Sequence, residues 1–185
     1  EASGIPHGKQ VAFLPVLTLL RGLFGITERD ANAEVRQKVA GALVLLDASF
    51  ERVLPVWFDF VGAPDPSRPA PALDAADRER LILEGLRRLV RARSERGPAL
   101  LLLEDLHWFD AASEKVLATL VDAVRDTRTL LLLNFRPEFR ADWMQGSEYQ
   151  QLPLRPLGHE AIAGLLADLL GAHASVAPLA QRIAQ

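Results

Sequence analysis

At 185 residues the chain is long enough to build a hydrophobic core of its own. Apolar residues make up 49% of it and charged residues 24%, which is a globular composition and excludes a disordered or membrane-embedded chain. The net charge of −3 provides no general attraction to nucleic acid or acidic lipid. The chain has no cysteine, which excludes disulfides and zinc sites built on thiolates.

No membrane or export signal is predicted near the N-terminus. The first residues lack the basic region and apolar stretch of a signal peptide. The most apolar early segment, residues 11–26, is interrupted by Pro15 and Arg21 and is shorter than the roughly 20 residues that cross a bilayer. We therefore expect a soluble, cytoplasmic chain without a membrane partner.

The first part of the chain is predicted to be helical. Apolar residues recur at helical spacing from Phe13, which predicts a helix that ends before Gly25. A second helix is predicted over residues 32–50, and the aromatic stretch 53–60 predicts a short third helix. The prolines of residues 62–71 predict a loop that closes this part.

A long helix is predicted to begin at Asp74 and to end near Arg96. Its apolar face consists of Leu81, Ile82, Leu86, Leu89 and Val90. It also carries arginines at positions 87, 88, 91, 93 and 96. These could bind nucleic acid, or they could form a solvated face whose charge favours the helix C-terminus. The acidic net charge favours the solvated face, so we expect no nucleic-acid partner for this segment.

Beyond Gly97 the pattern changes to buried strands. Residues 99–103 and 129–133 are unbroken apolar runs, which predict adjacent parallel strands covered on both faces. A helix over residues 111–125, with Asp110 as its N-cap, is expected to connect them.

The remaining elements complete the prediction of fold class. A weaker strand is predicted at residues 151–154, followed after Pro156 by a leucine-rich helix that ends at Gly171. Alternating strands and helices predict an α/β fold in which a parallel sheet has helical crossovers.

Two adjacent carboxylates, Glu104 and Asp105, follow the first predicted strand directly. This is the edge at which open α/β sheets place their ligands. Neighbouring strand residues point to opposite faces, so one acid could approach a metal while the other reaches elsewhere. That division suits a magnesium ligand and a residue that polarises water. The alternative is a strand that simply ends in polar residues before a loop. We expect His107 and Trp108 to be packing residues, although either could couple nucleotide state to a neighbouring domain.

Residues 103–110 read LEDLHWFD and resemble the Walker B signature of STAND-type ATPase modules, which are AAA-like P-loop ATPases. Such modules occur in large bacterial signalling proteins, including multidomain adenylate/guanylate cyclases and LuxR-type transcription activators. Residues 131–139, LLLNFRPEF, look like the family's next strand, which ends in a sensor arginine. Residues 152–157, LPLRPL, look like the entry to its lid, and residues 13–26 look like part of its helical insert.

The resemblance implies a partial, three-layer P-loop NTPase fold with an N-terminal helical insert. Residues 1–72 would be the insert, residues 73–157 the sheet core with the Walker B and sensor strands, and residues 158–185 the start of the helical lid.

The resemblance also implies roles for individual residues. Glu104 would hold magnesium through water, Asp105 would orient the attacking water, and Arg136 would sense or stabilise the γ-phosphate. Because the family more often has Asp at the first acidic position, the roles of Glu104 and Asp105 could be exchanged. Arg136 could instead be a turn residue in a surface ion pair.

The phosphate-binding loop of that family is expected upstream of this chain. Such a loop needs G-x-x-x-x-G-K-[ST] between a strand and a helix, because consecutive backbone amides wrap the phosphates. The only Gly-Lys pair, Gly8-Lys9, is followed by Gln10 in place of a hydroxyl residue, and no strand is expected before it.

We therefore interpret the chain as part of a regulatory switch that binds and hydrolyses ATP with Mg²⁺ in a larger multidomain protein. Its partners would be ATP and the other domains of the same polypeptide, and the isolated chain is expected to be inactive. The alternatives are a degenerate ATPase-like scaffold for protein contacts and a basic-helix module that binds nucleic acid.

Overall fold

The computed structural model describes residues 1–5, 11–146, 148–171 and 177–183. The chain divides into two compact units, Glu1–Met144 and Gln145–Gln185, which are described separately. The three-part division by role expected from the sequence stays a prediction. No helix in the described ranges combines the length and the apolar character needed to cross a membrane.

The first unit begins with a helical region. Helix α1 (Leu14–Phe24) ends at Gly25, whose φ of 65° lies in the left-handed region that glycine adopts without strain. Helix α2 (Asn32–Leu46) is shorter than expected, so the prediction of a helix to residue 50 is wrong. The chain leaves the helix at Asp47, whose carboxylate accepts the backbone N–H of Ser49 and so begins another turn.

The aromatic stretch packs as predicted. After the 3₁₀ helix η2 (Ala48–Val53), helix α3 (Leu54–Phe60) buries Trp57 completely. The Trp57 indole makes edge-on contacts with the rings of Phe24, Phe50 and Phe60. It also lies against Gly85 of the next helix, where a Cβ would come within 2.6 Å of the indole.

Helix α4 (Ala75–Arg96) begins and ends where the sequence predicts. The Asp74 carboxylate accepts the Asp77 N–H at 2.7 Å, which caps the helix. The arginines of its C-terminal half are exposed, and two of them contact the helical region. Arg88 forms an ion pair of 3.4 Å with Asp47, and Arg96 donates to the carbonyl of Leu45.

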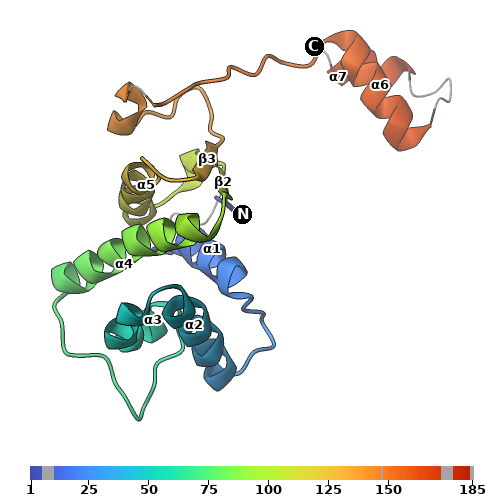
Figure 1. Ribbon diagram of the computed structural model, residues 1–185. Coiled ribbons are helices and arrows are strands. Elements are labelled where there is room, and N and C mark those ends of the chain that lie inside the picture. The colour runs from blue at the N-terminus through green and yellow to red at the C-terminus, as the bar shows by residue number, and fades with distance from the viewer. Residues whose placement is uncertain (6–10, 147, 172–176, 184–185) are drawn as a thin grey trace. The chain divides into compact units, whose positions relative to one another are not determined.

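Three parallel strands form the sheet in the order β1-β2-β3 (Figure 1). The expected neighbours, β2 (Ala99–Glu104) and β3 (Thr129–Leu133), pair in parallel, which confirms that prediction. The chain is therefore a mixed α/β protein with a small parallel sheet.

Strand β1 (Ala2–Ser3) was not expected, so the prediction that no strand comes before Gly8-Lys9 is wrong. Two residues are too few to show a hydrophobic period. The strand exists because it pairs with the last residues of β2, and the local sequence carries no sign of that pairing.

The prediction that both faces of the sheet are covered is also wrong. The register places Leu101, Leu103, Leu131 and Leu133 on one face, where they contact the core. It places Leu100, Leu102, Leu130 and Leu132 on the other face. Of the second set, Leu100, Leu130 and Leu132 are 59%, 63% and 50% exposed. Leu102, on the same face, is half-buried, and we call this second face the bare leucine face.

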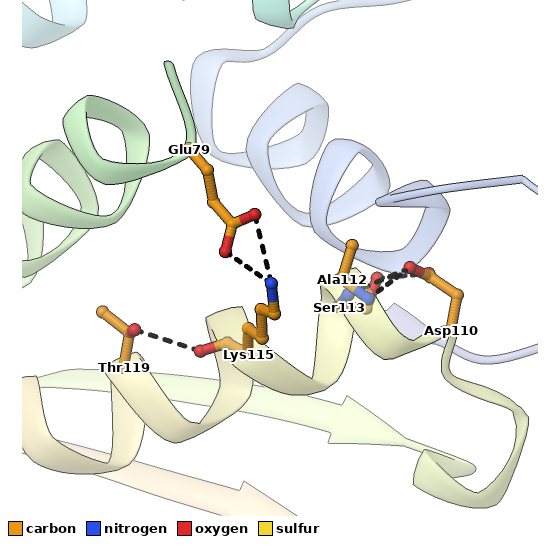
Figure 2. A network of polar contacts seen from close by, with 6 residues as sticks. All are labelled: Glu79, Asp110, Ala112, Ser113, Lys115 and Thr119. Atoms are coloured by element: carbon orange, nitrogen blue, oxygen red, sulfur yellow. Dashed lines mark hydrogen bonds and ion pairs between the residues drawn. The ribbon is translucent and has the colours of Figure 1, made fainter. Parts of the chain in front are cut away.

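Helix α5 (Ala111–Ala123) is the crossover between β2 and β3, and it packs against α4. Figure 2 shows how the two helices are joined: Lys115 Nζ of α5 donates to both carboxylate oxygens of Glu79 on α4, at 2.9 and 3.2 Å. At the start of α5, Asp110 accepts the N–H groups of Ala112 and Ser113, as its predicted N-cap role requires.

A short 3₁₀ helix, η4 (Asp142–Gln145), lies at the boundary between the units. In the second unit, α6 (His159–Leu170) ends at Gly171 as predicted, and α7 (Ala177–Ile183) packs against it. The strand predicted at residues 151–154 does not form, so that prediction is wrong. Leu152 and Leu154 are more than four-fifths exposed, because no described strand pairs with this segment.

Candidate functional site

The loop that follows β2 makes a tight turn directly after the two acids. Asp105 takes a left-handed backbone with φ of 55°, and the 3₁₀ helix η3 (Leu106–Trp108) follows at once. The Trp108 N–H donates to the Asp105 carbonyl at 2.8 Å. Such a backbone is uncommon for a residue other than glycine and is tolerated mainly by Asp and Asn.

Gly4, at the end of β1, packs directly on this turn. Its N–H donates to the Glu104 carbonyl at 2.9 Å. A Cβ at Gly4 would lie 2.6 Å from the Asp105 carbonyl oxygen and 2.9 Å from the Trp108 Cβ. Only glycine permits this approach, so β1 and the acidic turn are in direct contact.

Asn134, the first residue after β3, holds the two acids from the neighbouring strand. Its Oδ1 accepts the Asp105 N–H at 2.7 Å, and its Nδ2 donates to Glu104 Oε1 at 3.0 Å. Its backbone N–H donates to the Leu103 carbonyl, and its own carbonyl accepts the Leu106 N–H, both at 3.1 Å. We call these four hydrogen bonds the Asn134 clamp.

The sequence analysis did not single out Asn134. Its position could nevertheless have been inferred from the sequence. In a parallel sheet, the residues that follow neighbouring strands meet at the same edge. Leu103 pairs with Leu133, so Glu104 and Asn134 each follow directly after this last pair. An amide side chain at that position can donate to one group and accept from another at the same time.

On the other side of the acids lies β1. Ser3 pairs in register with Glu104, and its Oγ lies 3.4 Å from Asp105 Oδ2, a long hydrogen bond. The two carboxylates therefore have polar neighbours from both adjacent strands, at the carboxyl edge where the sequence analysis expected a site.

Arg136 lies close to the acidic turn but does not pair with its acids. Its exposed guanidinium sits over the Trp108 ring, with Cζ 5.9 Å from the ring centroid. Among the described residues it forms no ion pair with Glu104 or Asp105. The Trp108 ring in turn contacts the His107 ring, with centroids 5.0 Å apart. Both His107 ring nitrogens are buried without a hydrogen-bond partner in the described residues, so the contact of His107 with Trp108 is one of ring packing.

The donor set is compatible with magnesium. No cluster of three or more His, Asp or Glu side chains suited to a metal occurs within the described part of the chain. Magnesium does not require one, because proteins commonly bind it through one or two carboxylates, water and substrate phosphates. The Asn134 clamp occupies Oε1 of Glu104, so Oε2 is left as an oxygen ligand. The Gly8-Lys9 pair lies outside the described residues.

Two surface hollows lie away from the acids. Their volumes are about 440 and 530 Å³, and Arg91 and Glu95 of α4 line both. Residues 125–128, which line the larger one, precede β3, whereas the acids follow β2. Neither hollow is lined by Glu104, Asp105 or Asn134, so both are separate from the acidic site.

Comparison with known proteins identifies a family. Residues 2–133 match the family described as AAA ATPase domain. An uncharacterised protein of Rhizobium meliloti (strain 1021) is 33% identical over 72 residues, which are 39% of this chain and 7% of that protein. The chain thus matches only a small part of that relative's length. No solved structure matches the chain significantly.

Proposed function

This chain belongs to the AAA ATPase domain family, and we propose on that premise that it forms the catalytic edge of an ATP-binding and ATP-hydrolysing module. The module acts as a nucleotide-dependent switch within a larger cytoplasmic protein, in the manner of STAND-type signalling ATPases. Its fold is a partial P-loop NTPase, in which α1 to α3 form a helical insert and α6 begins the lid.

The Asn134 clamp is the observation that carries this proposal. It fixes the backbone of Asp105 and one oxygen of Glu104 at the carboxyl ends of two parallel strands. Ligands of open α/β sheets bind at this edge, and side chains whose positions are fixed before the reaction lower its barrier most. A strand that merely ended in polar residues would not need both acids to be held by a neighbouring strand.

The proposed roles follow from the positions of the groups. Glu104 would hold magnesium through water by its Oε2, while Asn134 holds its other oxygen. Asp105 accepts a hydrogen bond from the attacking water and orients it toward the γ-phosphate. Arg136 donates to γ-phosphate oxygens, for which its planar fork is suited. When bound, magnesium supplies positive charge that offsets the charge of the phosphates.

The decisive experiment uses the full-length protein that contains this chain. Asp105→Asn is expected to reduce ATP hydrolysis by about 10²–10⁴-fold, the usual contribution of a positioned base, while ATP binding is largely kept. Asp126→Asn is the matched control: Asp126 is exposed and also left-handed, with φ of 57°, but it precedes β3 at the other edge. Steady-state hydrolysis and calorimetric binding of ATP measure the two effects.

Each result has a distinct meaning. Unchanged hydrolysis in Asp105→Asn would contradict the role of Asp105. If Glu104→Gln loses hydrolysis while Asp105→Asn keeps it, the two acids have exchanged roles. Failure of the unsubstituted protein to bind ATP would favour a second candidate, a degenerate scaffold for protein contacts. The bare leucine face, with Leu130 63% exposed, is the observation that favours such contacts.

A further inference from the structure

The guanidinium of Arg136 is held by an aromatic ring and not by a carboxylate. Its Cζ lies 5.9 Å from the centroid of Trp108, which is within the range of a cation–π interaction. The two residues come from different segments: Trp108 ends η3 after β2, and Arg136 follows β3. The contact therefore joins the acidic turn to the loop of the neighbouring strand.

The Trp108 ring is well placed to serve as a fixed support. Its backbone N–H donates to the Asp105 carbonyl at 2.8 Å, and its Cβ lies beside Gly4, where a side chain would come within 2.9 Å of it. The His107 ring packs on it with centroids 5.0 Å apart. Since the nitrogens of His107 make no hydrogen bonds in the described residues, the histidine adds packing without competing for the guanidinium.

An aromatic support differs from an ion pair because it leaves the N–H donors and the charge of the arginine available for a ligand. A carboxylate partner would occupy N–H donors of the arginine and offset its charge, whereas a ring face uses none of the five donors. It also restricts a long side chain that otherwise loses considerable rotamer entropy when it binds a ligand. An arginine held in this way keeps its full charge and its planar fork for phosphate oxygens.

We propose that Trp108 is a positioning residue, which holds the Arg136 guanidinium ready for the terminal phosphate of ATP. The inference rests on the proposed function, because it assigns Trp108 a part in that same site. The inference adds that the acidic turn and the sensor arginine act together: the turn that carries Glu104 and Asp105 also sets the position of Arg136.

The test compares ATP with ADP in the full-length protein, since ADP lacks the phosphate that Arg136 contacts. Trp108→Leu should weaken ATP binding about two- to five-fold relative to ADP, the effect of losing one exposed cation–π contact. Trp108→Phe should retain most of the affinity, because it retains a ring face.

In an Arg136→Ala background, Trp108→Leu should have no further effect. Arg140→Ala, which loses only donors to nearby carbonyls, is the control.

A second measurement separates positioning from folding. Site-specific fluorinated tryptophans at position 108 keep the shape of the ring and progressively weaken its attraction for a cation. We expect ATP affinity to fall stepwise with fluorine number while ADP affinity and thermal unfolding stay constant. A flat response, together with loss of the ATP preference in Arg136→Ala, would overturn the role of Trp108 and leave the proposed function intact. If the unsubstituted protein binds no ATP, both fail.

Discussion

The Asp110 carboxylate joins two helices from a single buried position. Its Oδ1 accepts the N–H groups of Ala112 and Ser113, which begin α5, and its Oδ2 accepts a hydrogen bond from the Ser113 hydroxyl at 2.6 Å (Figure 2). Its Oδ1 also accepts the N–H of Phe13, the residue before α1. Burial alone would raise the pKa of this carboxyl, but the hydrogen bonds from Ser113 and Phe13 outweigh it and hold the pKa below its usual value.

A pKa that is lower in the folded state makes the stability depend on pH. The stabilisation is present above the unfolded pKa of about 4 and is lost as pH falls through the lower, folded pKa. We expect Asp110→Ala to lower the free energy of unfolding by about 1–2 kcal/mol at pH 7 and to flatten its fall at acidic pH. Urea unfolding at a series of pH values measures this, with exposed Asp122→Asn as control. An unchanged acid profile in Asp110→Ala would contradict it.

Some residues of the site could be identified from the sequence, and others could not. Glu104 and Asp105 could be found because two acids follow an apolar run. The Asn134 clamp could not be read in the same way, because its importance comes from the register of β2 against β3. Arg136 was identified by resemblance, but its contact with Trp108 joins residues 28 positions apart and has no local pattern.

Elements were predictable wherever a repeating pattern and an end signal agreed. The helices α1, α4, α5 and α6 have an apolar period bounded by a cap or a glycine, and each forms where the sequence indicated. Strands were harder to predict, because a strand forms only when it pairs with another strand. The two residues of β1 pair and so form a strand, whereas residues 151–154 find no described partner and do not.

The two faces of the sheet illustrate the same limit. Both leucine runs are unbroken and therefore suggested a sheet buried on each side. The alternation of exposed and covered leucines is set by the helices that pack on the sheet and not by the strands themselves. A continuous apolar run therefore does not show which face of a strand is covered.

A pair of substitutions can test this asymmetry. Leu103→Lys places a charge at a 2% exposed position and should cost more than about 3 kcal/mol or prevent folding. Leu130→Lys, at a 63% exposed position, should change stability by no more than about 0.5 kcal/mol. Thermal and urea unfolding of the 185-residue chain give both values. A comparable loss in the two variants would show that the second face is also covered.

At the scale of the whole molecule, the acidic edge and the bare leucine face occur together on one small sheet. Glu104 lies on the same face as Leu100 and Leu102, because strand residues alternate. Parallel sheets are almost always covered on both faces, so this face is suited to a further apolar element. The acidic site is thus bordered by an exposed apolar surface.

The isolated 185-residue chain is expected to bind ATP only weakly. Most of the affinity of a P-loop ATPase comes from backbone amides that wrap the phosphates, and the sequence contains no G-x-x-x-x-G-K-[ST] motif. Carboxylates repel phosphate unless magnesium lies between them, and one exposed arginine is a weak anchor. We therefore expect the 185-residue chain to show no micromolar ATP binding by calorimetry with magnesium present, and Asp105→Asn to change nothing. Micromolar binding would mean that the chain holds a phosphate site of its own, and Gly8→Ala and Lys9→Ala would then show whether that pair forms it.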